Sequence, residues 1–253
     1  MVLQSILFFL SRIISWPWFS RIMSWRLFKK IRAIWAASLA RDSVEDVQEY
    51  WNTRTKGFGS SWASGFWSIP ELSKKIDDLQ MRRLKPYVEQ IKPCQKVLEV
   101  GCGVGRFTSR LANKGAQIYG IDTSKEAIDI MKKKAIPDAR FEVMDARSLK
   151  FQDETFDWIF SITVLMHITE IQELFRAAKE ILRVLKKDGK TILLECTTDM
   201  RRERIVLSLP RSEWMKIFER AGGRIESFEE IDYPIPSWKG WYTLFQVTKR
   251  KID

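Results

Sequence analysis

The chain has 253 residues, a 45% share of hydrophobic residues and a formal net charge of +11. This length suits one α/β domain with an extension, and 12 glycines and 8 prolines exclude a disordered or repetitive protein. The charge is spread unevenly, because residues 1–41 carry seven of the 43 basic residues and none of the 32 acidic ones. No nucleic-acid partner is expected, since it would require a basic face rather than a basic terminus.

Residues 1–41 form a basic, tryptophan-rich segment. Apolar residues recur in it at helical spacing, at Leu3, Leu7, Leu10, Ile14, Trp18 and Ile22. Arg12 and Arg21 interrupt it before the roughly 20 apolar residues that a bilayer requires, and its tryptophans suit the headgroup region of a membrane. We expect an amphipathic helix on a membrane surface. Packing of these aromatic residues against the rest of the chain or a partner subunit is the alternative, and a cleaved signal peptide is a weaker one.

Residues 42–93 are expected to form a helical extension. A helix is predicted from Glu71 to about Gln90 because apolar residues recur there at helical spacing. The stretch at 57–62, rich in Gly, Ser and Trp, could form a lid over a site, or its aromatic residues could pack into the core.

A short apolar strand, Lys96–Val100, leads directly into a turn with three glycines at every second position, Gly101–Gly105. A helical pattern follows, so the turn lies at the carboxyl end of a strand, where glycine lets a ligand approach the backbone. Arg106 stands where a nicotinamide-binding fingerprint needs glycine or alanine, which disfavours a pyrophosphate ligand. Glu99, just before the turn, could accept a hydrogen bond from an ammonium group.

The next strand, Gln117–Ile121, ends at an acidic residue. Asp122 follows Gly105 by seventeen residues, and a carboxylate at this place could accept hydrogen bonds from both hydroxyls of a ribose. Thr123 and Glu126 have the spacing of a capping box, which predicts that a helix begins immediately after the strand. A capping or surface role for Asp122 is the alternative.

Three further strands follow in alternation with helices, which predicts a parallel sheet with its ligands at the carboxyl ends. The run Arg140–Met144 ends at Asp145–Ala146, which could accept a hydrogen bond from the exocyclic amine of an adenine. Phe156–Ile162 leads to His167 and a helix, and Thr191–Glu195 forms the fifth strand.

These motifs, in this order, resemble those of class I S-adenosylmethionine-dependent methyltransferases, of the broad group that acts on small molecules, quinones, sugars and lipids. The resemblance covers roughly residues 85–250. It implies an α/β fold with a Rossmann-like, doubly wound sheet of seven strands whose last strand is antiparallel. Here the closing pair would be 224–231 and 241–248, and the cofactor would be S-adenosylmethionine.

The resemblance also implies which residues bind the cofactor. The glycine turn would face its methionine part and Asp122 its ribose. Asp145 and Ala146 would face the adenine, and Ser161 would lie beside the methyl donor. The expected cofactor-binding set is Glu99, Gly101, Cys102, Gly103, Gly105, Asp122, Thr123, Asp145, Ala146 and Ser161.

Methyl transfer from a sulfonium depends on alignment and needs no protein nucleophile, so catalytic residues can be few. A hydroxyl acceptor needs a base, and His167, the single histidine of the chain, is the candidate. A packing or capping role is the alternative for His167, and Glu195 is a weaker candidate base. No Cys/His set or acid-rich cluster indicates a metal.

The sequence therefore predicts three parts: a membrane-surface segment at 1–41, a helical or lid extension at 42–93 and an S-adenosylmethionine-binding domain at 94–253. Together they suggest a methyltransferase for a small-molecule acceptor, lipid-linked in view of the basic segment: a phospholipid, a quinone or a lipid-carried sugar. The expected location is the cytoplasm, at the inner face of the cell membrane. A non-catalytic membrane-associated subunit that retains the fold is the alternative.

Overall fold

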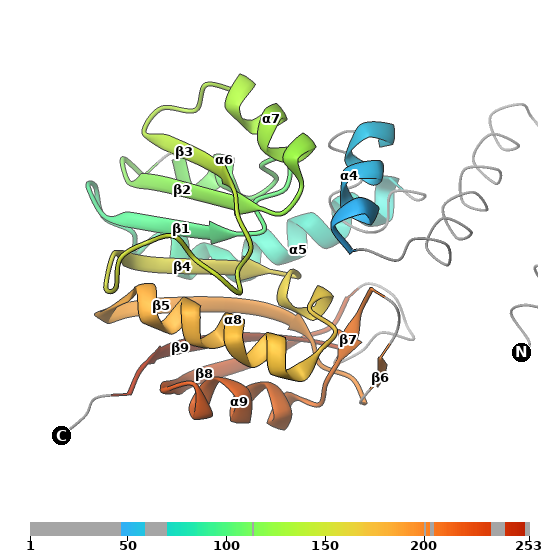
Figure 1. Cartoon of the computed structure of the whole chain (residues 1–253), viewed down its shortest axis with the longest axis vertical. Helices are drawn as coiled ribbons and strands as arrows, with labels where there is room; N and C mark the ends of the chain where they lie inside the picture. The colour runs from blue at the N-terminus through green and yellow to red at the C-terminus, as the bar shows by residue number, and fades with distance from the viewer. Residues whose placement is uncertain are drawn as a thin grey trace, which may run out of the picture. The chain divides into compact units, whose positions relative to one another are not determined.

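A seven-stranded sheet forms the centre of the structure, a computed structural model that describes residues 47–58, 70–112, 114–199, 201–202, 205–233 and 241–250 (Figure 1). The strand order is β3-β2-β1-β4-β5-β9-β8, and β9 runs antiparallel to both of its neighbours. The strands are β1 Lys96–Val100, β2 Gln117–Asp122, β3 Ala139–Val143, β4 Phe156–Ile162, β5 Leu185–Cys196, β8 Gly223–Ile231 and β9 Tyr242–Lys249. A separate two-stranded sheet pairs β6, Arg201–Arg202, with β7, Leu207–Ser208.

Strand β1 lies at the centre of the parallel part of the sheet. It pairs in parallel with β2 on one side and β4 on the other, and helices cover both faces, so its apolar residues are buried. Val100 at its end lies opposite Ile121 of β2 and Ser161 of β4. The residues that follow these three strands therefore meet at one edge of the sheet.

The predicted fold class is confirmed. The five expected parallel strands are all present, and β8 and β9 form the expected antiparallel closing pair, with β9 inserted between β5 and β8. Helices α8 and α9 lie in front of the sheet in Figure 1, and α5 lies behind it. The helices are α4 Val47–Phe58, α5 Pro70–Val88, α6 Thr108–Ala112, α7 Lys125–Lys133, α8 Ile171–Val184 and α9 Arg211–Arg220, with a short 3₁₀ helix η2 at Leu165–His167.

Helix ends differ from the sequence patterns in three places. The capping-box pattern predicts Thr123 as the cap of α7, but Ser124 takes that place and its hydroxyl accepts the N–H of Ala127. Thr169 would open α8 by the same pattern, whereas the helix begins at Ile171. Residues 187–189 have the composition of a helix stop, but α8 already ends at Val184 and β5 begins at Leu185, a buried residue that pairs with Phe156 of β4.

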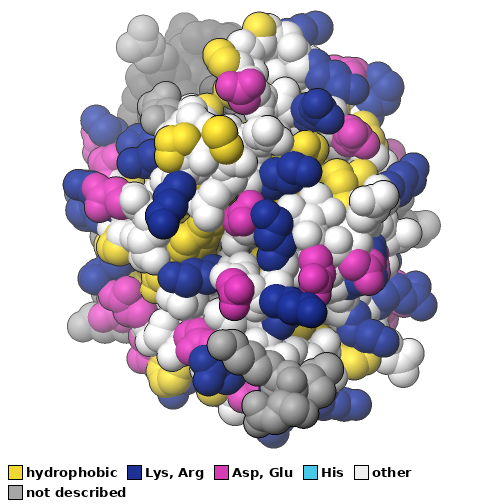
Figure 2. Space-filling model, turned by 90° about the vertical axis from the view of Figure 1, so that its left-hand side faces the viewer, with side chains coloured by type: hydrophobic (Ala, Val, Ile, Leu, Met, Phe, Trp, Pro, Cys, Tyr) yellow, Lys and Arg dark blue, Asp and Glu magenta, His cyan; other side chains and the backbone are white. Residues whose placement is uncertain are grey.

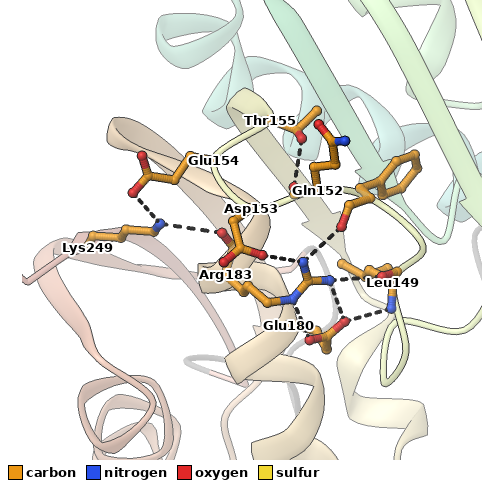
Figure 3. A network of polar contacts seen from close by, with 9 residues as sticks. Leu149, Gln152, Asp153, Glu154, Thr155, Glu180, Arg183 and Lys249 are labelled. Carbon is orange, nitrogen blue, oxygen red and sulfur yellow. Dashed lines mark hydrogen bonds and ion pairs between the residues drawn. The ribbon is translucent and has the colours of Figure 1, made fainter.

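A network around Arg183 fastens the connection between β3 and β4 to the end of α8 (Figure 3). The Arg183 guanidinium donates to the carbonyl oxygens of Leu149 and Phe151 at 2.9 and 2.8 Å, and it pairs with Glu180 and Asp153. Glu180 in turn accepts the N–H of Leu149 at 2.8 Å. These bonds hold in place the connection whose first residues follow β3 at the ligand edge of the sheet.

The charges of the described part are mixed. Figure 2 shows the face from which the parallel strands start, and basic and acidic side chains are interspersed on it rather than separated into patches. Residues 45–253 form one compact unit. The predicted membrane-surface segment at 1–41 and most of the Gly/Ser/Trp stretch lie outside the described residues, so the three-part division stays a prediction. Among the helices that are described, none has the length and apolar character of a membrane span.

Candidate active site

A cavity of about 510 Å³ opens at the carboxyl ends of β1, β2 and β4. This volume is within the range of small-molecule sites in proteins. Its walls come from α4, the glycine turn after β1, the residues that follow β2, β3 and β4, and the start of α8. The lining includes eight of the ten predicted cofactor residues: Glu99, Gly101, Cys102, Gly103, Asp122, Thr123, Asp145 and Ala146. His167 also lines the cavity.

The glycine turn is bound to the neighbouring strand and open toward the cavity. The N–H groups of Gly101 and Cys102 both donate to the carbonyl oxygen of Ile121, at 2.8 and 2.9 Å. Gly101 has φ +70°, and a Cβ there would lie 2.3 Å from Cγ2 of Val164. Gly103 has φ +51°, yet a Cβ there would meet no atom within 4 Å. The backbone at Gly103 thus leaves space for a ligand rather than for packing.

Asp122 holds the glycine turn and the start of α7 together. Its Oδ2 accepts the N–H of Gly103 and its Oδ1 accepts the N–H of Ser124, both at 2.8 Å. Burial raises the pKa of Asp122 above its usual value, and these N–H donors oppose that rise. A carboxylate has about four lone-pair positions, so two backbone donors leave it able to accept hydroxyls as well.

Glu99, on β1 just before the turn, carries a buried carboxyl group, and 4% of the residue's surface is exposed. The hydroxyl of Thr108 donates to Oε2 of Glu99 at 2.6 Å. Burial raises the pKa of Glu99 from 4.5 to about 8, while the hydrogen bond from Thr108 and the positive charge of Arg106 lower it. A cationic ligand group beside Glu99 would replace the water that burial removed and stabilise the ionised form.

The pKa of Glu99 predicts a pH dependence of stability in the ligand-free protein. Because the folded-state pKa is raised, the contribution of Glu99 to stability is complete below pH 4.5 and is lost as the pH rises to about 8. The loss is at most about 1.4 kcal/mol per pH unit. Glu99→Gln should therefore flatten the fall of unfolding free energy between pH 6 and pH 8, measured by urea denaturation.

Glu89→Gln is the matched control, because Glu89 is exposed and follows the end of α5. This control should keep the slope of the wild-type protein. Equal slopes in the wild-type protein and Glu99→Gln would contradict the assigned pKa.

Asp145 and Ala146 line the cavity at the end of β3. The guanidinium of Arg147 binds Asp145 through Nη2 at 2.6 Å and Nε at 2.9 Å, and the N–H of Arg147 also donates to its Oδ1. Burial by itself would raise the pKa of Asp145, but the hydrogen bonds and the positive charge of Arg147 lower it by more. The pKa of Asp145 therefore lies below its usual value. Asp145 is thus an ionised acceptor at neutral pH.

His167 faces the cavity from the 3₁₀ helix that follows β4. Its Nδ1 lies 2.6 Å from the carbonyl oxygen of Ile205, which can only accept, so Nδ1 carries the proton. In the neutral ring the lone pair is then on Nε2. The Trp51 ring of α4 meets the imidazole edge to face, with ring centres 4.9 Å apart.

Three residues considered at the same edge are turned away from the cavity. Ser161 is fully buried and its hydroxyl donates to Glu195 at 3.3 Å, and the Cα of Gly105 faces the side chain of Met131. Glu195, the weaker candidate base, does not line the cavity. Its carboxylate is fully buried and accepts the N–H groups of Leu165 and Met166, both at 3.1 Å, so it supports the 3₁₀ helix instead.

Helix α4 forms a wall of the cavity that the sequence patterns missed. Gln48 of α4 donates to the carbonyl oxygen of Thr123 at 2.8 Å, and Lys56 pairs with Glu126 of α7 at 2.8 Å. The residues of α4 that line the cavity are Val47, Gln48, Trp51 and Thr55. No local motif marks these residues, and their mixed composition indicates only a helix.

Curated relatives match the central part of the chain. The family model described as a methyltransferase domain matches residues 98–193. The O-methyltransferase cnsE of Penicillium expansum is 27% identical over 166 residues, which are 62% of this chain and 59% of that protein. The demethylmenaquinone methyltransferase of Thermotoga maritima is 32% identical over 126 residues, 49% of this chain and 53% of that protein. Phosphoethanolamine N-methyltransferase 1 of Arabidopsis thaliana is 36% identical over 115 residues, 43% of this chain and 23% of that protein. The chain therefore spans less than two thirds of each of these relatives.

Solved structures share the fold. A SAM-dependent methyltransferase of Leishmania major matches with a TM-score of 0.65 and 14% identity, over 80% of this chain and 81% of that one. One of Methanosarcina mazei matches with a TM-score of 0.58 and 21% identity, over 65% of this chain and 96% of that one. The cyclase SpnF matches with a TM-score of 0.56 and 22% identity, over 70% of this chain and 81% of that one. Residues 98–193 thus match a methyltransferase domain, and the described part of the chain has the Rossmann-like fold that these solved S-adenosylmethionine-dependent methyltransferases share.

Proposed function

We propose that the protein transfers a methyl group from S-adenosylmethionine to a small-molecule acceptor. The observation that carries this proposal is the cavity wall that joins the open glycine backbone at Gly103, the buried carboxyl group of Glu99 and the half-buried carboxylate of Asp122. Five carboxyl groups and two arginines line the cavity, which suits a ligand of positive charge. The donor set therefore fits S-adenosylmethionine, which supplies an electrophilic methyl group on a positively charged sulfur when bound.

The chain's own groups would bind and orient the cofactor. The glycine turn would take the methionine part, with Glu99 accepting from its ammonium group. Asp122, with Thr123 beside it, would accept from the ribose, and Asp145 with Ala146 would take the adenine. These assignments rest on the positions of the residues along the cavity wall. Because methyl transfer is an in-line displacement, such positioning supplies much of the rate.

His167 is proposed to accept the proton of a hydroxyl acceptor at Nε2. The hydrogen bond from Nδ1 to the Ile205 carbonyl fixes the tautomer and the ring orientation, and Trp51 packs against the ring. In His167→Asn, the side-chain amide can still donate a hydrogen bond from near the position of Nδ1, but the basic nitrogen Nε2 is lost. We expect His167→Asn to lower kcat by about 10²- to 10³-fold with cofactor affinity unchanged, and to remove the acidic limb of the rate–pH profile.

His167→Ala serves as the comparison, because it removes the hydrogen bond to Ile205 as well as the base. If His167→Asn retains full kcat while His167→Ala loses it, the histidine packs and does not transfer a proton.

A lipid-linked acceptor is proposed from the N-terminal segment and from the relatives. Residues 1–41 combine basic residues with tryptophans, as expected for a segment at the inner face of a cell membrane. One of the relatives is named for demethylmenaquinone, a lipid-soluble quinone, whereas another is named for phosphoethanolamine, which is water-soluble. The basic segment and the quinone acceptor of that relative support a phospholipid, a quinone or a lipid-carried sugar as the acceptor.

Transfer of labelled methyl groups into extracts of the host tests the activity and the acceptor class together. Incorporation into the lipid extract supports the proposal, whereas incorporation only into the soluble extract refutes the lipid-linked acceptor. Co-sedimentation with liposomes of anionic phospholipid tests the membrane role, with the full chain beside a variant that starts at Ser43. Equal sedimentation of the two would refute it.

A non-catalytic subunit that retains the fold is the second candidate. The match to SpnF, which is named a cyclase, shows that a protein with this fold need not be named for methyl transfer, because the fold alone does not determine the function. Calorimetry with S-adenosylmethionine and turnover assays separate the two candidates. Binding without transfer to any lipid or soluble extract would favour the subunit.

A further inference from the structure

The candidate base His167 is held by groups near the carboxyl end of β5, and only one of these groups enters the proposed function. Oε1 of Glu195 accepts the N–H of Leu165 and its Oε2 accepts the N–H of Met166, both at 3.1 Å. These are the first two residues of η2, and His167 is the third. The hydroxyl of Ser161 on β4 also donates to Oε1, at 3.3 Å. Glu195 is thus bonded to the backbone directly before the imidazole.

The partners of Glu195 all belong to one short segment. In the part of the chain that the structure describes, each of its side-chain hydrogen bonds goes to residues 161–166, between the end of β4 and η2. The carboxyl group is fully buried, and burial raises the pKa of Glu195 from 4.5 to about 8, while the N–H donors of η2 oppose that rise. Because a buried carboxyl group that loses its donors is destabilising, these bonds fix the backbone of η2 relative to β5.

The imidazole ring is fixed by a second route that also leads to β5. Nδ1 of His167 donates to the carbonyl oxygen of Ile205 at 2.6 Å, and Ile205 is buried. Strand β7 begins two residues later, and Oγ of its Ser208 lies 3.4 Å from Sγ of Cys196. Cys196 follows Glu195 as the last residue of β5. Consecutive residues of one strand therefore contact the backbone before His167 and the strand that follows its carbonyl partner.

The position of Nε2 in the cavity depends on both routes. One route fixes the backbone from which the side chain of His167 extends, and the other fixes the rotation of its ring. A displacement of about 1 Å at a reacting group can lower a rate by about 10²-fold. Neither Glu195 nor Ser161 lines the cavity, so these residues can affect proton transfer only through His167.

We propose that Glu195 is a positioning residue that fixes the backbone of η2, so that Nδ1 of His167 meets the Ile205 carbonyl and Nε2 faces the acceptor. The inference rests on the proposed function, because it assumes that His167 takes a proton from the acceptor. A purely structural Glu195 would stabilise the fold, and its loss would lower the melting temperature without changing the state of the imidazole.

Nitrogen NMR of the full chain, labelled at histidine, separates these roles. His167 is the single histidine of the sequence, so the two ring signals come from this residue alone. At a pH where the ring is neutral, the wild-type protein should show one protonated and one unprotonated nitrogen. Glu195→Gln keeps the shape of the side chain but only one acceptor oxygen, so one N–H of η2 loses its partner. We expect the two nitrogen shifts to move toward each other, because the released ring exchanges between tautomers.

Activity and cofactor binding should respond differently to the same substitution. Glu195→Gln should lower kcat for transfer of labelled methyl groups into the host extract by about 10- to 100-fold. Its affinity for S-adenosylhomocysteine, measured by calorimetry, should change by less than about twofold. Ser161→Ala removes one donor to Glu195, so it should move the nitrogen shifts in the same direction and lower kcat by a few-fold.

Glu180→Gln is the matched control for a lost carboxylate that binds a backbone N–H. Glu180 on α8 accepts the N–H of Leu149 at 2.8 Å and does not line the cavity. This control should lower the melting temperature and leave the nitrogen shifts of His167 unchanged.

The outcomes separate the positioning role from the proposed function. Wild-type nitrogen shifts or wild-type kcat in the folded Glu195→Gln protein would overturn the inference, as would equal shifts in Glu180→Gln. If Glu195→Gln does not fold, Ser161→Ala decides in the same way. If the wild-type protein transfers no methyl group to a lipid or a soluble extract, the proposed function fails, and the nitrogen shifts still show whether Glu195 positions the ring.

Discussion

Asp122→Asn is expected to weaken the binding of S-adenosylmethionine by about 100-fold, which corresponds to two lost or weakened charge-assisted hydrogen bonds. Asp122 accepts the N–H groups of Gly103 and Ser124 with its two oxygens. Asparagine has one oxygen, so its amide N–H₂ must face one of those donors or the ligand's hydroxyls. Isothermal titration calorimetry with S-adenosylmethionine, in the absence of an acceptor, gives the change in affinity directly.

Asp129→Asn is the control for this experiment. Asp129 is an exposed residue of α7 that pairs with Lys125 at 2.6 Å, and its loss should leave affinity unchanged. Thermal unfolding must show that Asp122→Asn remains folded. A folded Asp122→Asn protein with wild-type affinity would show that Asp122 is a structural residue of the turn and does not bind the ribose.

Two substitutions in the glycine turn should have opposite effects on folding and binding. Gly101→Ala should destabilise the protein by about 3 kcal/mol, since alanine is strained at φ +70° and its Cβ would overlap Val164. Gly103→Ala adds the same methyl group where no protein atom lies within 4 Å. It should cost only about 1 kcal/mol of stability, yet weaken S-adenosylhomocysteine roughly 10- to 100-fold, because the methyl group projects into ligand space.

Urea denaturation and calorimetry of both variants check this contrast. The double variant Gly101→Ala with Val164→Ala should recover part of the lost stability, because the overlap is with the γ-methyl groups of Val164. Wild-type affinity in Gly103→Ala would show that the cofactor does not approach this backbone.

Local patterns were sufficient to predict the sheet and half of the site. The strand at Lys96–Val100 is an apolar run next to glycines, and a strand with such a composition is stable only when both faces are covered. Alternation of strands and helices then requires parallel neighbours, whose carboxyl ends share one edge. The approach of Gly103, Asp122 and Asp145 to one cavity follows from this topology, and the structure shows it.

Other features depended on tertiary contacts. Ser161 and Glu195 both lie on strands at the ligand edge, but each is buried and they bond to each other. Successive residues of a strand point to opposite faces, so strand membership alone does not tell which side chains reach a ligand. The sequence likewise gives no sign that His167 meets a tryptophan more than a hundred positions earlier.

The sequence by itself thus predicted the fold class, the succession of strands along the chain and the glycine turn, because these follow from local composition and from backbone positions that only glycine occupies without strain. The tertiary structure decided which acidic side chain supports a helix and which faces the cavity, and that α4 completes the cavity wall. Those roles depend on contacts between residues distant in sequence, and on the burial that such contacts create, neither of which is encoded in any local pattern.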